Sequence, residues 1–149
     1  MSGLAIREFR DTDRPEVIAL WRNCGLVVPW NDPDRDIDRK LQIDPELFLV
    51  GLNGSTVVAT VIGGYEGHRG WINYLAVSTS KRRMGYGQEM MQAVEQRIAA
   101  RGCPKINLQV RAANTEVLAF YRSLGYGVDD VVSMGKRLER DVNLSSGAQ

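Results

Sequence analysis

The sequence predicts a single α/β domain with a mixed central sheet of roughly six to seven strands and helices on both faces. In the first half, strand-like runs are joined by hairpin turns, which is typical of antiparallel strands. In the second half, strand-like runs alternate with segments of helical period, which is typical of crossovers between parallel strands. A length of 149 residues suits one domain, expected over residues 1–140, with a flexible tail over 141–149.

The first elements are a strand and two helices. The first ten residues form a strand at or near the edge of the sheet. A helix then opens at Asp13, its cap, with Pro15 in the first turn, and ends at Gly25. After a loop over residues 26–33, an acidic helix covers residues 33–43.

Three strands follow, and their signals are the clearest in the chain. Asn53-Gly54 is a strong two-residue hairpin signal between two apolar runs. The strands are expected over residues 48–52, 56–65 and 71–77. The turns between them are Asn53-Gly54 and residues 66–70.

The remaining elements alternate helix and strand. Apolar residues return at helical spacing at Tyr86, Met90, Met91, Val94 and Ile98. Residues 105–110 then alternate as a strand. Asn114 caps a further helix whose apolar face includes Tyr121, and residues 126–138 return to strand-like composition.

Composition and charge narrow the classes of protein. Nineteen Lys and Arg against 18 Asp and Glu give a net charge of +1, so nothing indicates global affinity for nucleic acid. No apolar run approaches the ~20 residues that span a bilayer, and the N-terminus lacks a secretory pattern. Two cysteines are too few for a disulfide framework. We therefore expect a cytoplasmic protein without membrane or nucleic-acid partners.

The turn after residue 77 carries the main functional signal. Its basic residues and glycines are Lys81, Arg82, Arg83, Gly85 and Gly87. The N-terminus of the following helix presents unpaired N–H groups and a partial positive charge, and glycines let a ligand approach the backbone. The turn therefore predicts a phosphate or pyrophosphate site. The alternative is a glycine-rich turn with solvated basic side chains.

Two other phosphate loops do not fit this turn. A P-loop ends in GK[ST], whereas Gln88 and Glu89 follow Gly87. A dinucleotide-binding fingerprint requires a third glycine, and that position holds Met90.

The same residues resemble a known family. Residues 82–87, RRMGYG, match the Q/R-x-x-G-x-G/A signature of the GCN5-related N-acetyltransferases (GNAT). Residues 74–77, YLAV, resemble that family's fourth strand. Asn114 with residues 119–126, AFYRSLGY, resembles its second motif. Within the family, the chain looks most like the ribosomal-protein N-terminal acetyltransferases.

The resemblance implies that acetyl-CoA lies in a V-shaped gap between the fourth and fifth strands, with no metal. Backbone groups of Leu75 and Val77 would pair with the pantetheine arm, and the amides of residues 82–87 would hold the pyrophosphate. The full set of implied cofactor-binding residues is Leu75, Ala76, Val77, Arg82, Arg83, Met84, Gly85, Tyr86, Gly87, Asn114 and Tyr121. Asn114 is also interpretable as a simple helix cap, and both roles can hold.

By the same resemblance, Tyr121 would be the general acid. An amine attacks the thioester directly, and a phenol within ~3 Å of the sulfur can stabilise or protonate the departing thiolate. A backbone N–H at Leu75 or Ala76 would polarise the thioester carbonyl. The alternative for Tyr121 is a core tyrosine, since it lies on the apolar face of its helix.

The general base is where the sequence departs from the branch it resembles. That branch has a Glu in the fifth strand, where this chain has Gln109, and an amide cannot take a proton. Glu66 or His68 would act through water, or no base is needed. An α-amine, with a pKa of about 7.7–8.0, needs less help than a lysine amine near about 10.4.

The acceptor side is expected from residues 26–43 and from the 66–70 turn. Between residues 31 and 46, six acidic against three basic residues give −3, which attracts a cationic substrate or simply solvates a helix face. Val28 and Trp30 would line an apolar pocket, cover a sheet edge or serve dimer contacts.

The sequence therefore predicts an acetyl-CoA-dependent N-acetyltransferase that acts on a primary amine. The acceptor is a protein N-terminus or a small molecule, and a homodimer is an open option. The main alternative is a non-catalytic acyl-CoA-binding or sensing module. A weaker alternative is an interaction domain whose basic turn meets nucleic acid.

Overall fold

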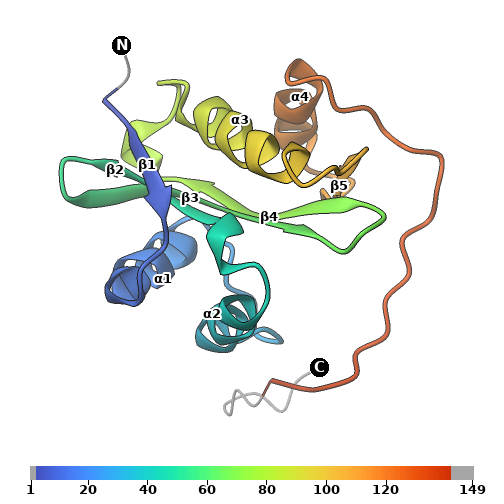
Figure 1. The fold of residues 1–149 in the computed structure, drawn as a ribbon, viewed down its shortest axis with the longest axis horizontal. Helices are drawn as coiled ribbons and strands as arrows, with labels where there is room; N and C mark the ends of the chain where they lie inside the picture. Colours follow the sequence, from blue (N-terminus) through green and yellow to red (C-terminus); the bar gives the residue numbers. More distant parts are fainter. Residues whose placement is uncertain (1–2, 142–149) are drawn as a thin grey trace.

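A computed structural model of the chain describes residues 3–141, which form a five-stranded sheet with helices on both faces (Figure 1). The strands lie in chain order, β1-β2-β3-β4-β5. The first four are antiparallel to their neighbours, and β5 is parallel to β4. The mixed sheet covered on both faces is confirmed, but six to seven strands is wrong for the described residues.

The helices and strands are placed close to the predicted ranges. They are β1 (Ala5–Glu8), α1 (Arg14–Asn23), α2 (Pro33–Gln42), β2 (Phe48–Asn53), β3 (Thr56–Tyr65), β4 (Gly70–Val77), α3 (Tyr86–Ala99), β5 (Ile106–Leu108) and α4 (Thr115–Ser123). No described helix is both long enough and apolar enough to cross a membrane.

The β2–β3 hairpin lies where the sequence predicts it, with its turn one residue later. Asn53 stays in the strand opposite Thr56, so the two turn residues are Gly54, with φ 60°, and Ser55. The Asn53 side chain explains this shift, because its Nδ2 donates to the Gly3 carbonyl (2.9 Å) and to the Tyr86 hydroxyl (3.0 Å).

Each face of the sheet has its own hydrophobic core. Helices α1 and α2 cover one face around the fully buried Trp21 and Phe48. On the other face, α3 buries the predicted stripe that includes Met90, Val94 and Ile98, and α4 packs beside it. The two cores hold the sheet between them, with β4 between the central strand β3 and the edge strand β5.

The segment after α4 overturns a prediction. Residues 126–138 form no strand but run extended past the β4–β5 side of the sheet towards α2 (Figure 1). Strand β5 has only three residues and offers little edge for another strand to pair with. The segment leaves five large apolar side chains exposed: Val128, Val131, Val132, Met134 and Leu138.

Side chains fix this segment at both ends. Asp129 accepts hydrogen bonds from Lys105 and Asn107 beside β5. Asp141, which the sequence assigns to the flexible tail, is buried and ion-paired with Arg39 of α2 at 2.6 Å. The rest of the predicted tail, residues 142–149, lies outside the described residues.

Candidate active site

The gap predicted between the fourth and fifth strands is present. Strands β4 and β5 pair only from Gly70–Ile106 to Ile72–Leu108 and not beyond. Within β4, Tyr74 has φ 52°, and the pairing with β3 shifts register between Thr60 and Ile62. Such a bulge increases the twist of a strand, which turns the end of β4 away from β5.

The direction of the β4 backbone distinguishes Leu75 and Val77 from Ala76. Ser78 N–H donates to the Val58 carbonyl at 2.8 Å, and Ala76 is paired with Thr60. The backbone N–H and C=O groups of Ala76 and Ser78 therefore face β3. Backbone groups alternate in direction along a strand, so those of Leu75 and Val77 face away from β3. Leu75 lines the hollow, whereas the Val77 carbonyl accepts from Cys24 Sγ at 3.4 Å and from Arg82 Nε at 3.5 Å. Ala76 N–H is thereby excluded as a donor into the gap, and Leu75 N–H remains.

The basic turn beyond β4 adopts a conformation suited to an anion. Arg83 (φ 67°) and Gly85 (φ 82°) are both left-handed, and Gly85 is the N-cap residue directly before α3. A non-glycine residue in this region carries strain, which is typical of functional sites. The first amides of α3 have no carbonyl partner within the helix, and the exposed Arg82 and Arg83 precede them in the turn.

The residues of the turn differ in the space around them and in the exposure of their side chains. Gly85 has open space where a side chain would start, as a ligand site requires. A Cβ on Gly87 would lie 3.1 Å from Phe120 Cζ, so this glycine serves the packing of α3 against α4. The Tyr86 side chain is buried, so only its backbone amide is left to contact a ligand at the turn. The Met84 side chain is exposed.

A hollow of about 890 Å³ opens beside the gap. The loop after α1, α2, β4 and the β5–α4 connection all line it, and Leu75, Asn114 and Tyr121 contribute to its wall. Tyr121 also borders a second hollow of about 1300 Å³, which β5, α4 and the extended segment line. Burial raises the pKa of Tyr121 to about 12, so its hydroxyl keeps its proton at neutral pH.

Two further side chains of this wall have structural partners. The Asn114 side chain accepts from Val117 N–H at 3.2 Å, so the helix-cap interpretation is confirmed, and its contact with pantetheine stays a prediction. Gln109 also lines the hollow, and its Nε2 donates to the Ser133 hydroxyl of the extended segment.

The two base candidates lie elsewhere. Neither Glu66 nor His68 lines either described hollow. The Glu66 carboxylate accepts hydrogen bonds from the backbone N–H groups of His68 and Arg69, which lower its pKa and hold it within its own turn. The 66–70 turn therefore does not form the predicted acceptor wall.

We expect Glu66→Gln and His68→Ala to leave the pH dependence of kcat/KM unchanged. With no protein base, log kcat/KM rises with pH only as the acceptor amine loses its own proton. The measurement is the pH profile of thiol release by each variant. Loss of a limb near about pH 6 in either variant would restore that residue as the base.

The acceptor side retains only part of the predicted acidic surface. Of the six acidic residues between 31 and 46, only Asp36 lines the hollow, together with Val28 and Trp30. Asp34 and Asp38 pair with Arg14, and Asp44 and Glu46 pair with Arg101. Among residues 3–141, no group of three or more His, Cys, Asp and Glu side chains is placed to hold a metal ion.

Sequence reasoning missed the side chain of Tyr74. Its hydroxyl donates to the Asp36 carboxylate at 2.5 Å, and both residues line the hollow. Its strand position could be read from the sequence, but no local signal shows its left-handed backbone or its partner on α2.

Comparisons with known proteins agree with this geometry. The profile of the Acetyltransferase (GNAT) family matches residues 9–126. A protein of Yersinia pestis named acetyltransferase is 47% identical over 135 residues, covering 91% of this chain and 96% of its own.

Solved structures share the fold at lower identity. The AAC(6')-Iy enzyme in complex with a CoA bisubstrate analogue superposes with a TM-score of 0.74 at 17% identity, covering 90% of this chain and 98% of its own. The ribosomal-protein alanine N-acetyltransferase of Escherichia coli superposes with a TM-score of 0.69 at 19% identity, covering 82% and 76%. The family match and the Yersinia relative together show that this chain belongs to the GNAT family of acetyltransferases.

Proposed function

We propose that this protein transfers an acetyl group from acetyl-CoA directly to a primary amine. The observation that carries the proposal is one hollow in which the open backbone edge of β4 at Leu75 meets the protonated phenol of Tyr121. The anion-binding turn at the end of the same strand adds the second half of a CoA site. Two fold neighbours support it, one solved with a CoA bisubstrate analogue and one named for acetylating a protein alanine.

Each part of the chain has a defined role in this proposal. The amides of residues 82–87 bind the pyrophosphate, and the backbones of Leu75 and Val77 pair with the pantetheine arm. Acetyl-CoA supplies an activated acetyl group as a thioester. Leu75 N–H polarises the thioester carbonyl. The neutral amine nitrogen bonds to the carbonyl carbon and releases its extra proton to solvent. As the C–S bond breaks, Tyr121 gives its proton to sulfur, and solvent returns one to the Tyr121 oxygen.

Gln109 supports a second candidate function, a non-catalytic acyl-CoA-binding module. In that case the missing carboxylate reflects lost chemistry. Thiol release from acetyl-CoA with a panel of primary amines separates the two functions, because the binding module releases none above the solvent rate.

The first test is thermal unfolding with acetyl-CoA, CoA, NADH and ATP in parallel. A ligand at 100 times its Kd adds about 2.7 kcal/mol to the free energy of unfolding. For this chain length, that raises Tm by roughly 5–10 °C. We expect the shift with acetyl-CoA and CoA and none with NADH or ATP. No shift at millimolar acetyl-CoA would overturn the proposal.

A further inference from the structure

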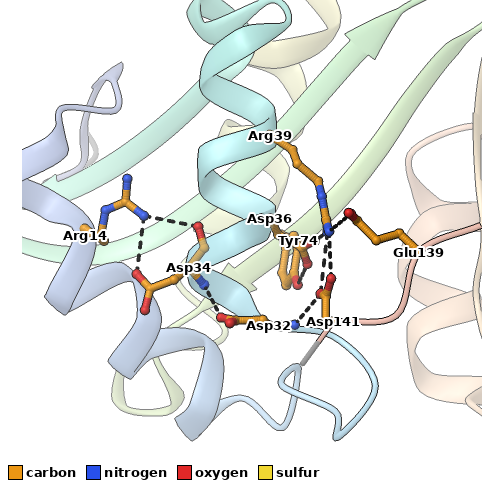
Figure 2. Close-up of polar contacts among 8 residues, drawn as sticks. All are labelled: Arg14, Asp32, Asp34, Asp36, Arg39, Tyr74, Glu139 and Asp141. Carbon is orange, nitrogen blue, oxygen red and sulfur yellow. Dashed lines mark hydrogen bonds and ion pairs between the residues drawn. The ribbon is translucent and has the colours of Figure 1, made fainter. Parts of the chain in front are cut away.

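The acceptor side of the hollow contains one rigidly held carboxylate. Figure 2 shows Asp36 on α2 directed at the ring of Tyr74, whose hydroxyl donates to Asp36 Oδ2 at 2.5 Å. The Asp36 side chain stays 24% exposed, so its remaining surface is open to a ligand in the hollow.

The support behind this carboxylate is buried. The Tyr74 ring stacks on Trp21 with centroids 3.8 Å apart. Trp21 Nε1 donates to Thr60 Oγ1 at 2.9 Å, and Thr60 Oγ1 donates to the Tyr74 carbonyl at 2.9 Å. This chain of contacts ties the phenol to β3 and α1, so the position of Asp36 is set before any ligand arrives.

The cations on the same wall are already paired. Arg39 contacts Asp36 at 3.3 Å but also pairs with Glu139 at 2.7 Å and with Asp141 at 2.6 Å (Figure 2). Lys40 donates to the Gly63 carbonyl, and burial lowers its pKa. Arg39 therefore faces three carboxylates, of which only Asp36 lines the hollow, and Lys40 and Arg111 are the other charged residues of its lining.

The rest of the hollow carries an arginine and an apolar surface. Arg111, which follows β5, lines the hollow and has no ion-pair partner within residues 3–141. Trp30, 39% exposed, and Val28 add apolar surface next to α2. An acceptor with a short apolar chain and a positive end fits the wall formed by Asp36, Tyr74 and Trp30.

We propose that Asp36, positioned by Tyr74, binds a second positive group of the acceptor, so that the preferred acceptor is a diamine or a larger polyamine. This inference rests on the proposed function. The Tyr74 side chain extends from β4 to the acceptor side of the hollow and holds the Asp36 carboxylate there. The next residue in β4, Leu75, faces the gap. The reacting amine lies at the gap, and the second ammonium lies at Asp36.

The test compares cadaverine, spermidine and pentylamine, which have two, three and one amine. In the wild-type protein we expect kcat/KM for cadaverine and spermidine to exceed that for pentylamine by about tenfold or more, the scale of a charged hydrogen bond. Asp36→Asn should reduce that preference by about the same factor, mainly through KM for the diamine. Tyr74→Phe, which removes only the hydroxyl, should reduce it less.

Asp38→Asn is the matched control. It removes the same charge from the same helix, but Asp38 faces Arg14 outside the hollow, so the preference should stay at the wild-type value. A readout without turnover is the rise in Tm caused by each amine in the presence of saturating CoA. Cadaverine and spermidine should raise Tm of the wild type and of Asp38→Asn more than that of Asp36→Asn.

The outcomes separate the two proposals. Thiol release without a preference for the two polyamines, or with a preference that Asp36→Asn retains, overturns the role of Asp36 and leaves the acetyltransferase proposal standing. No Tm shift with CoA or acetyl-CoA overturns the proposed function itself. A CoA shift with no further amine shift in the wild type also overturns the role of Asp36.

Discussion

Tyr121→Phe is expected to lower kcat by roughly a hundredfold or more, the usual scale for loss of a general acid. Phenylalanine keeps the ring and its edge contacts with Phe120 and Tyr126 but removes the only proton that the side chain can give. Because burial raises the pKa of Tyr121 to about 12, the wild-type phenol stays protonated across the working pH range. Affinity for acetyl-CoA should change little, and thiol release at saturating acetyl-CoA measures kcat.

Tyr126→Phe is the control for this substitution. Its ring lies 5.6 Å from that of Tyr121, but its hydroxyl donates to Glu95, away from the hollow that contains Leu75. We expect near wild-type turnover from Tyr126→Phe. Normal kcat in Tyr121→Phe would remove the general-acid role and leave Tyr121 as a core tyrosine.

Gly85→Asp should abolish measurable binding of acetyl-CoA. The residue lies at the start of α3 with φ 82°, next to the amides that we assign to the pyrophosphate. A carboxylate at that point replaces the favourable field of the helix N-terminus with repulsion between like charges. Isothermal titration with acetyl-CoA measures the loss.

Gly85→Asn separates charge from backbone strain. Asn and Asp have similar size, and both tolerate the left-handed region better than other side chains. Space is also open at the Cβ of residue 85. We therefore expect Asn to weaken binding moderately and Asp to eliminate it. Equal affinities for the two variants would show that no anion lies at this turn.

Much of the architecture was readable locally. The β2–β3 hairpin, the apolar stripe of α3 and the Asn114 cap depend on residues within one or two turns of each other, so periodicity and capping signals predict them. The basic, glycine-containing turn over residues 82–87, for which we propose anion binding, was equally local. The strand predicted over 126–138 failed because a strand needs a partner edge, and the three residues of β5 give it almost none.

The site was only partly predictable for the same reason. The sequence pointed to Leu75, Val77, Gly85 and Tyr121, because they belong to recognisable motifs, and their roles stay predictions. It could not distinguish Gly87, which makes room for Phe120, from Gly85, which faces open space. Its two candidate bases, Glu66 and His68, belong to a turn that lies outside both hollows.

The sequence by itself determined the mixed sheet, the helix order, the glycine-rich basic turn before α3 and the family. These follow from hydrophobic period, turn residues and short motifs, each of which acts over a few residues. Only the tertiary structure decided the bulge at Tyr74, the pairing of Tyr74 with Asp36 and the choice of Asp36 among the nearby acidic residues. Those features depend on how α2 packs against β4, since charges and hydroxyl groups far apart in the chain meet only when both cores have formed.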